Sequence, residues 1–261
     1  MKGLKVALIT GASSGIGAAF AEALAADGLD LILVARSEDK LRTLAKQLFE
    51  VHSRRVEVVT ADLGLAGSAQ KVHAASEALG MPVDLLINNA GFGTAGTFIK
   101  QDAERERQEV LLNAAAVVDM THAFLPAMVE RKRGGIINVA SVAAFQPLPY
   151  MAVYAATKAF VMSFSQAVRG EVRSKGVKVL ALCPGPVDTP FFEATGNQKL
   201  RSTVPKASMM SAEAVVKAAL RAFAAGRSVL VPGIANKLLT SSVGFVPRDM
   251  LSAMTALVMK R

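Results

Sequence analysis

The sequence is poor in cysteine and in aromatic residues. Among its 261 residues it has one cysteine, Cys183, two tyrosines and no tryptophan. A single cysteine cannot form a disulfide within the chain, so nothing points to an oxidising compartment. The N-terminus lacks the apolar stretch and cleavage site of a secretory signal, and no run of ~18–20 uninterrupted apolar residues is present for a spanning helix. These absences predict a cytoplasmic protein.

Charged residues are also few, at 20% of the chain against 52% hydrophobic residues, which excludes an intrinsically disordered protein. Lysine and arginine (30) outnumber aspartate and glutamate (21), giving a net charge of +9. An excess of basic residues is compatible with binding to nucleic acid, to anionic lipid or to an acidic substrate. The basic residues are scattered, however, so we expect a solvated surface and no nucleic-acid binding. His52, His73 and His122 lack the spacing of metal ligands, so no metal is expected.

Short apolar runs alternate along the chain with longer segments of helical period. The runs show little polar–apolar alternation, which is typical of strands buried on both faces. This order predicts an α/β fold: one domain with a doubly wound sheet of seven parallel strands in the order 3-2-1-4-5-6-7. The expected strands are 4–10, 30–35, 56–60, 83–88, 135–140, 177–183 and 228–231, and the expected helices are 15–27, 37–52, 65–79, 102–130, 150–175 and 211–225.

Two stretches fit this alternation poorly. Residues 186–210 contain proline, glycine, asparagine, phenylalanine and methionine without a clear period, which predicts a loop. Residues 233–261 form a C-terminal extension that predicts an amphipathic helix. Its apolar face consists of Met250, Leu251, Met254, Leu257 and Val258, and the basic residues beside it are Arg248, Lys260 and Arg261.

A glycine-rich segment, TGASSGIG at 10–17, follows the first expected strand and opens the first expected helix. Glycines in such a turn permit a tight bend, close approach of the backbone to a pyrophosphate and close packing of helix on strand. The amides at the helix N-terminus then face the phosphates. The candidate phosphate-binding residues are Gly11, Ser13, Ser14, Gly15, Ile16 and Gly17.

The end of the second expected strand indicates which dinucleotide is bound. An acidic residue there binds the ribose 2′-hydroxyl of NAD, whereas an arginine accommodates the 2′-phosphate of NADP. Here the position holds Ala35, and Arg36 follows it. The sequence therefore favours NADP(H).

Tyr154 and Lys158 are four residues apart and share one face of an expected helix. A phenol with a pKa near ~10 is a poor base at neutral pH, and a nearby ammonium lowers that pKa. Ser141 follows another expected strand and can donate a hydrogen bond to a carbonyl oxygen. Together these residues can polarise a carbonyl group, with Tyr154 delivering a proton to its oxygen.

These motifs together resemble the short-chain dehydrogenase/reductase family, in its NADP-type general oxidoreductase branch. The resemblance covers nearly the whole chain and rests on TGASSGIG, Asp62, the NNAG at 88–91, Asn113, Ser141, the YAATK at 154–158 and the PGPVDT at 184–189. It implies a Rossmann-type domain. It also implies that Asn113 joins Ser141, Tyr154 and Lys158 in catalysis, holding a water that links Lys158 to solvent. The cofactor residues it adds are Asp62 and Leu63 beside the adenine, Asn89, Ala90 and Gly91 at the adenine ribose, and Pro184, Gly185, Val187 and Thr189 at the nicotinamide, next to Tyr154 and Lys158.

The substrate is less well defined, because this fold serves many substrates. Apolar residues fall in segments expected around the nicotinamide, and they suit a 3-oxoacyl, steroid-like or aromatic carbonyl compound. Besides Ser141 and Tyr154, the candidate substrate-binding residues are Phe92, Phe145, Leu148, Phe191 and Phe192.

Two alternatives to a soluble carbonyl reductase remain open. One is a non-catalytic NADP-sensing regulator on the same fold, although such proteins usually lose the tyrosine or the lysine. The other is a reductase of lipid carbonyls bound to a membrane surface through the C-terminal extension. The resemblance implies a homodimer or homotetramer built on helices 102–130 and 150–175.

Overall fold

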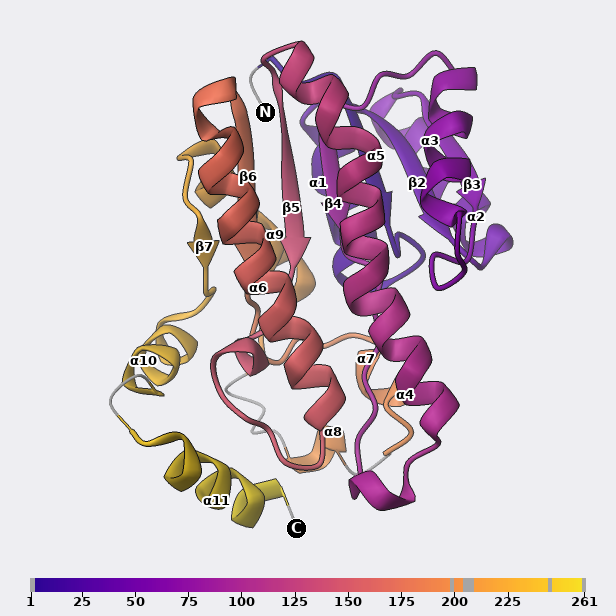
Figure 1. Cartoon of the computed structure of the whole chain (residues 1–261). Helices are drawn as coiled ribbons and strands as arrows, with labels where there is room; N and C mark the ends of the chain where they lie inside the picture. Colours follow the sequence, from indigo (N-terminus) through magenta and orange to yellow (C-terminus); the bar gives the residue numbers. More distant parts are fainter. Residues whose placement is uncertain (1–2, 198–199, 204–208, 244–245, 260–261) are drawn as a thin grey trace.

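The computed structural model describes residues 3–197, 200–203, 209–243 and 246–259. Seven parallel strands form one sheet in the order β3-β2-β1-β4-β5-β6-β7, which confirms the predicted topology (Figure 1). The strands are β1 Val6–Thr10, β2 Asp30–Ala35, β3 Val56–Thr60, β4 Leu85–Asn88, β5 Gly134–Val139, β6 Val177–Leu182 and β7 Val229–Leu230.

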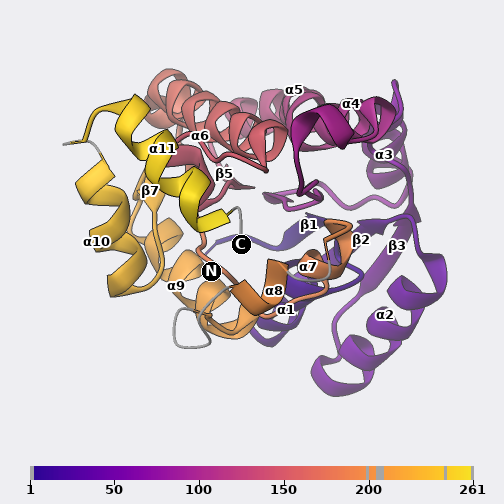
Figure 2. The same ribbon diagram turned by 90° about the horizontal axis from the view of Figure 1, so that it is seen from below.

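Helices cover both faces of the sheet (Figure 2). Alternate residues of each strand point to opposite layers: Ala7 and Ile9 pack with α1, α2 and α9, whereas Val6 and Leu8 pack with α3, α5 and the end of α6. Both strand faces are thus buried, which explains the continuous apolar runs. The helices are α1 Gly15–Ala26, α2 Glu38–His52, α3 Ser68–Ala78, α4 Ala103–Val110, α5 Ala116–Glu130, α6 Ala152–Val172, α7 Phe191–Ala194, α8 Leu200–Thr203, α9 Ala212–Ala224, α10 Ile234–Val243 and α11 Arg248–Met259.

The structure corrects the sequence prediction in three segments. The expected helix 102–130 is divided into α4 and α5 by a π-helical turn, Leu111–Ala115. The expected loop 186–210 contains the short helices α7 and α8. The C-terminal extension forms two helices, α10 and α11, rather than one. One extra residue in a turn, or a four-residue helix, leaves no signal in the hydrophobic period.

The continuous helical segment Ala103–Glu130 is long and apolar enough, by length and composition, to cross a membrane. Core helices of soluble folds meet the same criterion. Here the part that forms α5 packs against α3, β4 and β5. These are the contacts of a helix that covers a sheet.

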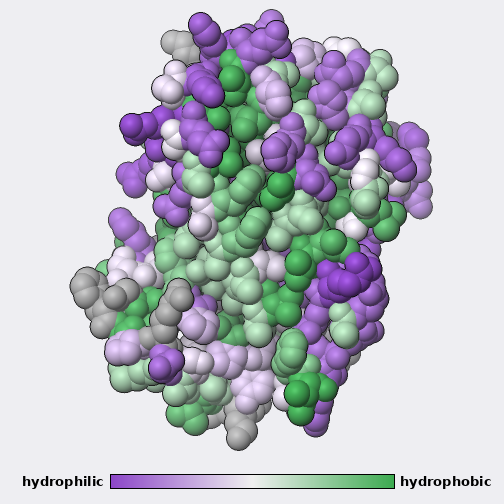
Figure 3. All heavy atoms as spheres, in the orientation of Figure 1, coloured by the Kyte–Doolittle hydropathy of each residue, from purple (hydrophilic) through white to green (hydrophobic). Residues whose placement is uncertain are grey.

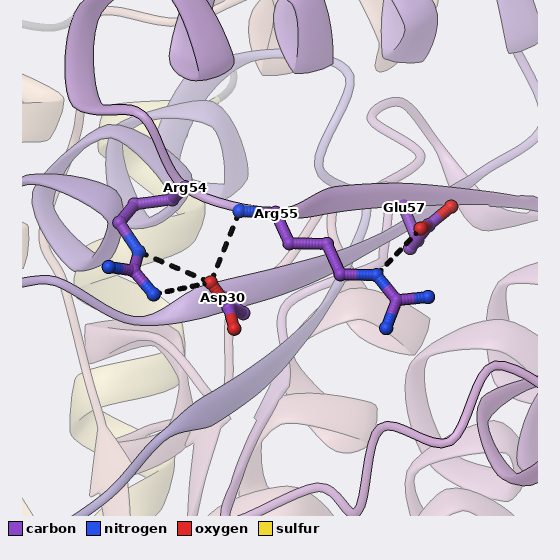
Figure 4. A network of polar contacts seen from close by, with 4 residues as sticks. All are labelled: Asp30, Arg54, Arg55 and Glu57. Atoms are coloured by element: carbon purple, nitrogen blue, oxygen red, sulfur yellow. Dashed lines mark hydrogen bonds and ion pairs between the residues drawn. The ribbon is translucent and has the colours of Figure 1, made fainter.

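Charged side chains hold the amino ends of the strands together. Asp30, the first residue of β2, accepts hydrogen bonds from the Arg54 guanidinium at 2.7 and 3.2 Å and from the Arg55 amide at 3.1 Å (Figure 4). Arg55 in turn donates to Glu57 at 2.9 Å on the edge strand β3. Asp84, just before β4, accepts from the Lys5 amide at 2.8 Å and from Arg133 at 3.0 Å. These contacts join neighbouring segments at the amino ends of the strands. Because the strands are parallel, their carboxyl ends all lie at the opposite edge of the sheet.

Candidate active site

A cavity of about 340 Å³ lies at the carboxyl ends of the strands, the usual place for ligands in such sheets. It brings together almost every residue predicted to bind the cofactor. Those that line it are Gly11, Ser13, Ser14, Gly15, Ile16, Arg36, Asp62, Leu63, Asn89, Ala90, Gly91, Tyr154, Lys158, Pro184, Gly185, Val187 and Thr189.

The glycine-rich segment has the geometry of a phosphate-binding loop. Gly11 and Gly15 have φ of +64° and +56°, values that favour glycine. Gly17 does not line the cavity; a Cβ atom there would lie 2.2 Å from the carbonyl oxygen of Gly11, so its role is close packing of the loop on α1. A Cβ at Gly15 would lie 3.1 Å from Thr189. Two predicted parts of the cofactor site are therefore adjacent.

The segment after β4 locks this loop in place. The side-chain amide of Asn89 donates to the carbonyl oxygens of Thr10 at 2.9 Å and of Gly11 at 3.2 Å. The backbone amides of Asn89 and Ala90 donate to the Thr10 hydroxyl at 2.9 and 3.0 Å. The loop thus keeps its shape through contacts with a strand that is distant in sequence.

Arg36 lies at the end of β2 with an exposed side chain that lines the cavity. It makes no hydrogen bond or ion pair with the residues that the structure describes. Its guanidinium is therefore available to an anionic group. The open loop backbone and this cation fit the pyrophosphate and the 2′-phosphate of NADP(H).

Tyr154 is on α6 and lines the cavity beside Ser141. Burial raises the pKa of the phenol to about 12; a hydrogen bond with Ser141 lowers it, and the charge of Glu109 raises it further. This corrects the expectation that a neighbouring ammonium lowers the phenol pKa below its ordinary value. Lys158 lies with its Nζ 5.7 Å from the phenol ring centre, and the largest cause of the raised pKa of Tyr154 is burial.

Lys158 is buried, with 6% of its surface exposed. Its ammonium donates to the carbonyl oxygen of Val139 at 2.9 Å. Burial lowers its pKa to about 8, while the negative charge of Glu109 opposes this shift. At neutral pH Lys158 is therefore mostly charged and close to its titration range.

Asn113 lies in the π-helical turn rather than in the cavity wall, and it is buried. Its side chain accepts from the Phe92 amide at 3.1 Å and donates to the Phe92 carbonyl at 2.8 Å and to the Thr157 hydroxyl at 3.2 Å. A Cβ atom at Gly91 would lie 2.7 Å from Asn113 Oδ1 and 3.5 Å from Lys158 Nζ. Asn113 and Lys158 thus both lie close to Gly91, and the hydrogen bonds of Asn113 hold the backbone of Phe92, which lines the cavity.

The predicted substrate residues fall into two groups. Phe92, Phe191, Ser141 and Tyr154 line the cavity. Leu148 and Phe192 instead belong to an apolar cluster that packs against Tyr154 and Phe191; its other members are Ala95, Met151, Leu200, Met209 and Met259.

Phe145 lies outside both groups. It ends the short 3-10 helix Val142–Phe145 and packs against Ala140, Val161 and Cys183. Phe145 therefore does not line the cavity, and its assignment to the substrate site stays a prediction.

The C-terminal helix α11 reaches the site from outside. Met259 packs against the apolar cluster beside Tyr154, and Leu251 is buried. Met250, Met254 and Leu257 remain 51–73% exposed. The side chains of Arg248 and Val258, and residues Lys260 and Arg261, lie outside the described part of the chain. The predicted apolar face is thus only partly covered within one copy of the chain.

Glu109 is a member of this site that sequence reasoning missed. It is fully buried on α4 and its charge acts on both Tyr154 and Lys158. The surrounding sequence, AERERQEV, has the composition of a solvated helix face. Only the tertiary structure shows that this glutamate turns inward.

Comparison with known proteins agrees with the site. The profile of the short chain dehydrogenase family matches residues 5–200. A very-long-chain 3-oxoacyl-CoA reductase of Rattus norvegicus is 33% identical over 219 residues, covering 82% of this chain and 67% of that protein. A solved short-chain dehydrogenase from Sphingobium yanoikuyae in complex with NADPH has a TM-score of 0.82 and 34% identity, covering 93% of this chain and 95% of the other. The bulky-bulky ketone specific alcohol dehydrogenase from Comamonas testosteroni has a TM-score of 0.78 and 33% identity, covering 93% of each chain.

This chain therefore belongs to the short-chain dehydrogenase/reductase family. It is an oxidoreductase and its cofactor is NADP(H).

Proposed function

We propose that the protein interconverts a ketone and a secondary alcohol on an apolar small molecule, with Tyr154 as general acid and base. The observation that carries this proposal is that Ser141, which follows β5, and Tyr154 and Lys158, on α6, line the same cavity as the glycine-rich loop. When bound, NADPH supplies the hydride for the carbonyl carbon. The protein must then supply binding, orientation and a proton.

Each of the three residues has a role that follows from its state in the structure. The raised pKa of Tyr154 keeps the phenol protonated at neutral pH, which is the form that donates a proton to a carbonyl oxygen. The Ser141 hydroxyl lies beside it and orients the same oxygen. Lys158, held by the Val139 carbonyl, places a positive charge next to the phenol and stabilises the phenolate that remains. We assign Asn113 to positioning Lys158 through the segment at Gly91 and Phe92.

The wall of the cavity favours an apolar substrate. Phe92 and Phe191 line it, and the apolar cluster beside Tyr154 extends the same surface. Two proteins to which this chain is similar are named for a 3-oxoacyl-CoA and for bulky ketones. We infer a substrate of this kind: a 3-oxoacyl, steroid-like or aromatic carbonyl compound.

Purified protein mixed with NADPH and a panel of ketones tests the proposal through the nicotinamide absorbance. We expect oxidation of NADPH with bulky apolar ketones and little with small polar ones. Tight NADPH binding without turnover of any ketone would instead favour the non-catalytic regulator.

We further infer a homo-oligomer. Figure 3 shows apolar side chains gathered over α5 and α6, where Phe160 is 45% exposed and stacks on Phe164. A large apolar patch on a protein surface usually marks an interface. Sedimentation velocity of the full chain tests this inference, with a monomer as the contrary result. The cytoplasmic location stays a prediction.

A further inference from the structure

Glu109 is a buried acid that the mechanism above does not use. It has no exposed surface, although α4 otherwise lies largely in solvent. Its Oε2 atom accepts hydrogen bonds from the Thr94 amide at 3.0 Å and from the Thr94 hydroxyl at 2.7 Å. Its Oε1 atom has no hydrogen-bond partner in the described chain. The buried carboxyl group of Glu109 is therefore held by two uncharged donors, both of which bind the same oxygen.

The contrast with Asp84 shows that this arrangement is unusual within the same molecule. Asp84 is 1% exposed, but Arg133 and the Lys5 amide satisfy both of its oxygens. Burial without a paired cation disfavours the ionised form of a carboxyl group. Accordingly, burial raises the pKa of Glu109 to about 7, against the opposing effects of Thr94 and of the charge of Lys158.

Residues 91–94 connect Glu109 to the catalytic side chains. A Cβ atom at Gly91 would lie 3.5 Å from Lys158 Nζ, and one at Gly93 would lie 3.0 Å from Cδ2 of Tyr154. Thr94 then holds the carboxyl group of Glu109. This short segment therefore passes close to Lys158 and Tyr154 and is hydrogen-bonded to Glu109.

We propose that Glu109 is a positioning residue of the active site: by gaining or losing a proton it sets the charge on Lys158 and the acidity of Tyr154. This inference rests on the proposed function. It adds a third titrating group to the site, one that touches neither the cavity nor the substrate.

The groups that face this cluster define the direction of the effect. Tyr154 and Lys158 face it from α6, and the thiol of Cys183 faces it from the segment after β6. Glu106 lies on α4 itself, and its charge raises the pKa of Glu109. Burial raises the pKa of Cys183 to about 12, so the thiol is neutral at the pH of interest. An ionised Glu109 raises the pKa of both Tyr154 and Lys158. Removing its charge must therefore lower both.

Glu109→Gln tests the proposal, because glutamine keeps an oxygen for the Thr94 donors and cannot ionise. For NADP⁺-dependent alcohol oxidation we expect the pH profile of kcat/KM to move to lower pH by about one unit. The two profiles should converge at pH values below the pKa of Glu109, where the wild-type group is also neutral. The control is Glu104→Gln, the same change at an exposed position of α4, and its profile should match the wild type.

A second readout needs no substrate. In the unliganded protein, the infrared band of a protonated carboxylic acid should titrate with a midpoint near pH 7 and be absent in Glu109→Gln. Thr94→Val, which keeps Glu109 but removes one donor to its ionised form, should move that midpoint upward. Thr94→Val carries the test if Glu109→Gln does not fold.

Two results would overturn the inference. One is a rate in Glu109→Gln that is reduced equally at every pH, which a purely structural role would produce. The other is the lack of any infrared band that titrates near neutral pH. Failure to oxidise or reduce any substrate, with the infrared titration intact, would count against the proposed function instead.

Discussion

Charged and titratable side chains have different partners at the two ends of this sheet. At the amino ends of the strands, Asp30 and Asp84 are paired with arginines and backbone amides. At the carboxyl ends, Glu109 and Lys158 are buried and Tyr154 is half-buried. None of the three forms an ion pair with a residue that the structure describes, and all three have displaced pKa values. Paired charges hold strands in position, whereas unpaired ones cost stability and acquire the proton affinities that catalysis uses.

Of the substitutions that test this difference between the two ends of the sheet, we expect the largest effect, a loss of turnover, at Tyr154. Tyr154→Phe removes the transferable proton and leaves the ring packing, so turnover should fall by roughly 10²–10⁴-fold while NADPH still binds. Steady-state kinetics and a cofactor-binding titration measure the two properties separately. Tyr150→Phe is the control, since Tyr150 is the only other tyrosine in the sequence, and it should keep most of the activity. Unchanged turnover in Tyr154→Phe would rule out this residue as the general acid.

The pH dependence of stability should show the unpaired carboxyl group directly. The pKa of Glu109 in the folded protein, about 7, lies above its ordinary value of 4.5. The stability that its protonation contributes is therefore present below pH 4.5 and is lost as the pH rises through about 7. The unfolding free energy of the wild type, relative to that of Glu109→Gln, should therefore fall by up to about 3 kcal/mol as the pH rises from 4.5 to about 7. Urea titrations at several pH values measure it, and a constant difference would contradict the account.

At the amino end the same kind of change should affect stability alone. Asp84→Ala removes a buried carboxylate with two partners, which should lower the unfolding free energy by about 2–3 kcal/mol. Activity per folded molecule should not change. Glu57→Ala breaks only the exposed pair with Arg55 and should cost below about 1 kcal/mol. Equal losses in the two variants, measured by urea unfolding, would argue against a special role for Asp84.

The smallest effect concerns the unpaired cation of the cofactor site. Arg36→Ala should weaken NADPH binding by roughly 10- to 100-fold and leave NADH binding almost unchanged, because only NADPH carries the 2′-phosphate. Arg42→Ala, which removes an exposed arginine already paired with Glu38, should change neither. Calorimetric titration of both cofactors makes the comparison. Equal losses for NADPH and NADH in Arg36→Ala would show that Arg36 only supports the loop.

The sequence predicted the parts of this molecule that depend on local pattern. Strand order and the glycine-rich loop follow from periodicity and glycine spacing, and the structure brings all but one of the predicted cofactor residues to one cavity. The substrate end was predicted less well. Phe145 is half-buried beside Ala140, Val161 and Cys183 rather than in the cavity lining, and the π-helical turn at Asn113 has no periodic signature.

Glu109 shows why the remainder could not be predicted. Its neighbours on α4 are arginines and glutamates, so no local rule distinguishes it from a solvated residue. Its burial depends on where residues 91–94 pass across α4 and α6. The raised pKa of Tyr154 has the same origin, because its largest cause is burial, which the local sequence does not reveal.

Transfer of an isotopic label tests the central claim most directly. NADPH carrying deuterium at both hydrogen positions of the reactive nicotinamide carbon is incubated with the enzyme and a bulky ketone, and the product is analysed by mass spectrometry. The account predicts one deuterium on the carbinol carbon of the alcohol, and almost no product with Tyr154→Phe. An alcohol without the label, or full label transfer by Tyr154→Phe at the wild-type rate, would contradict it.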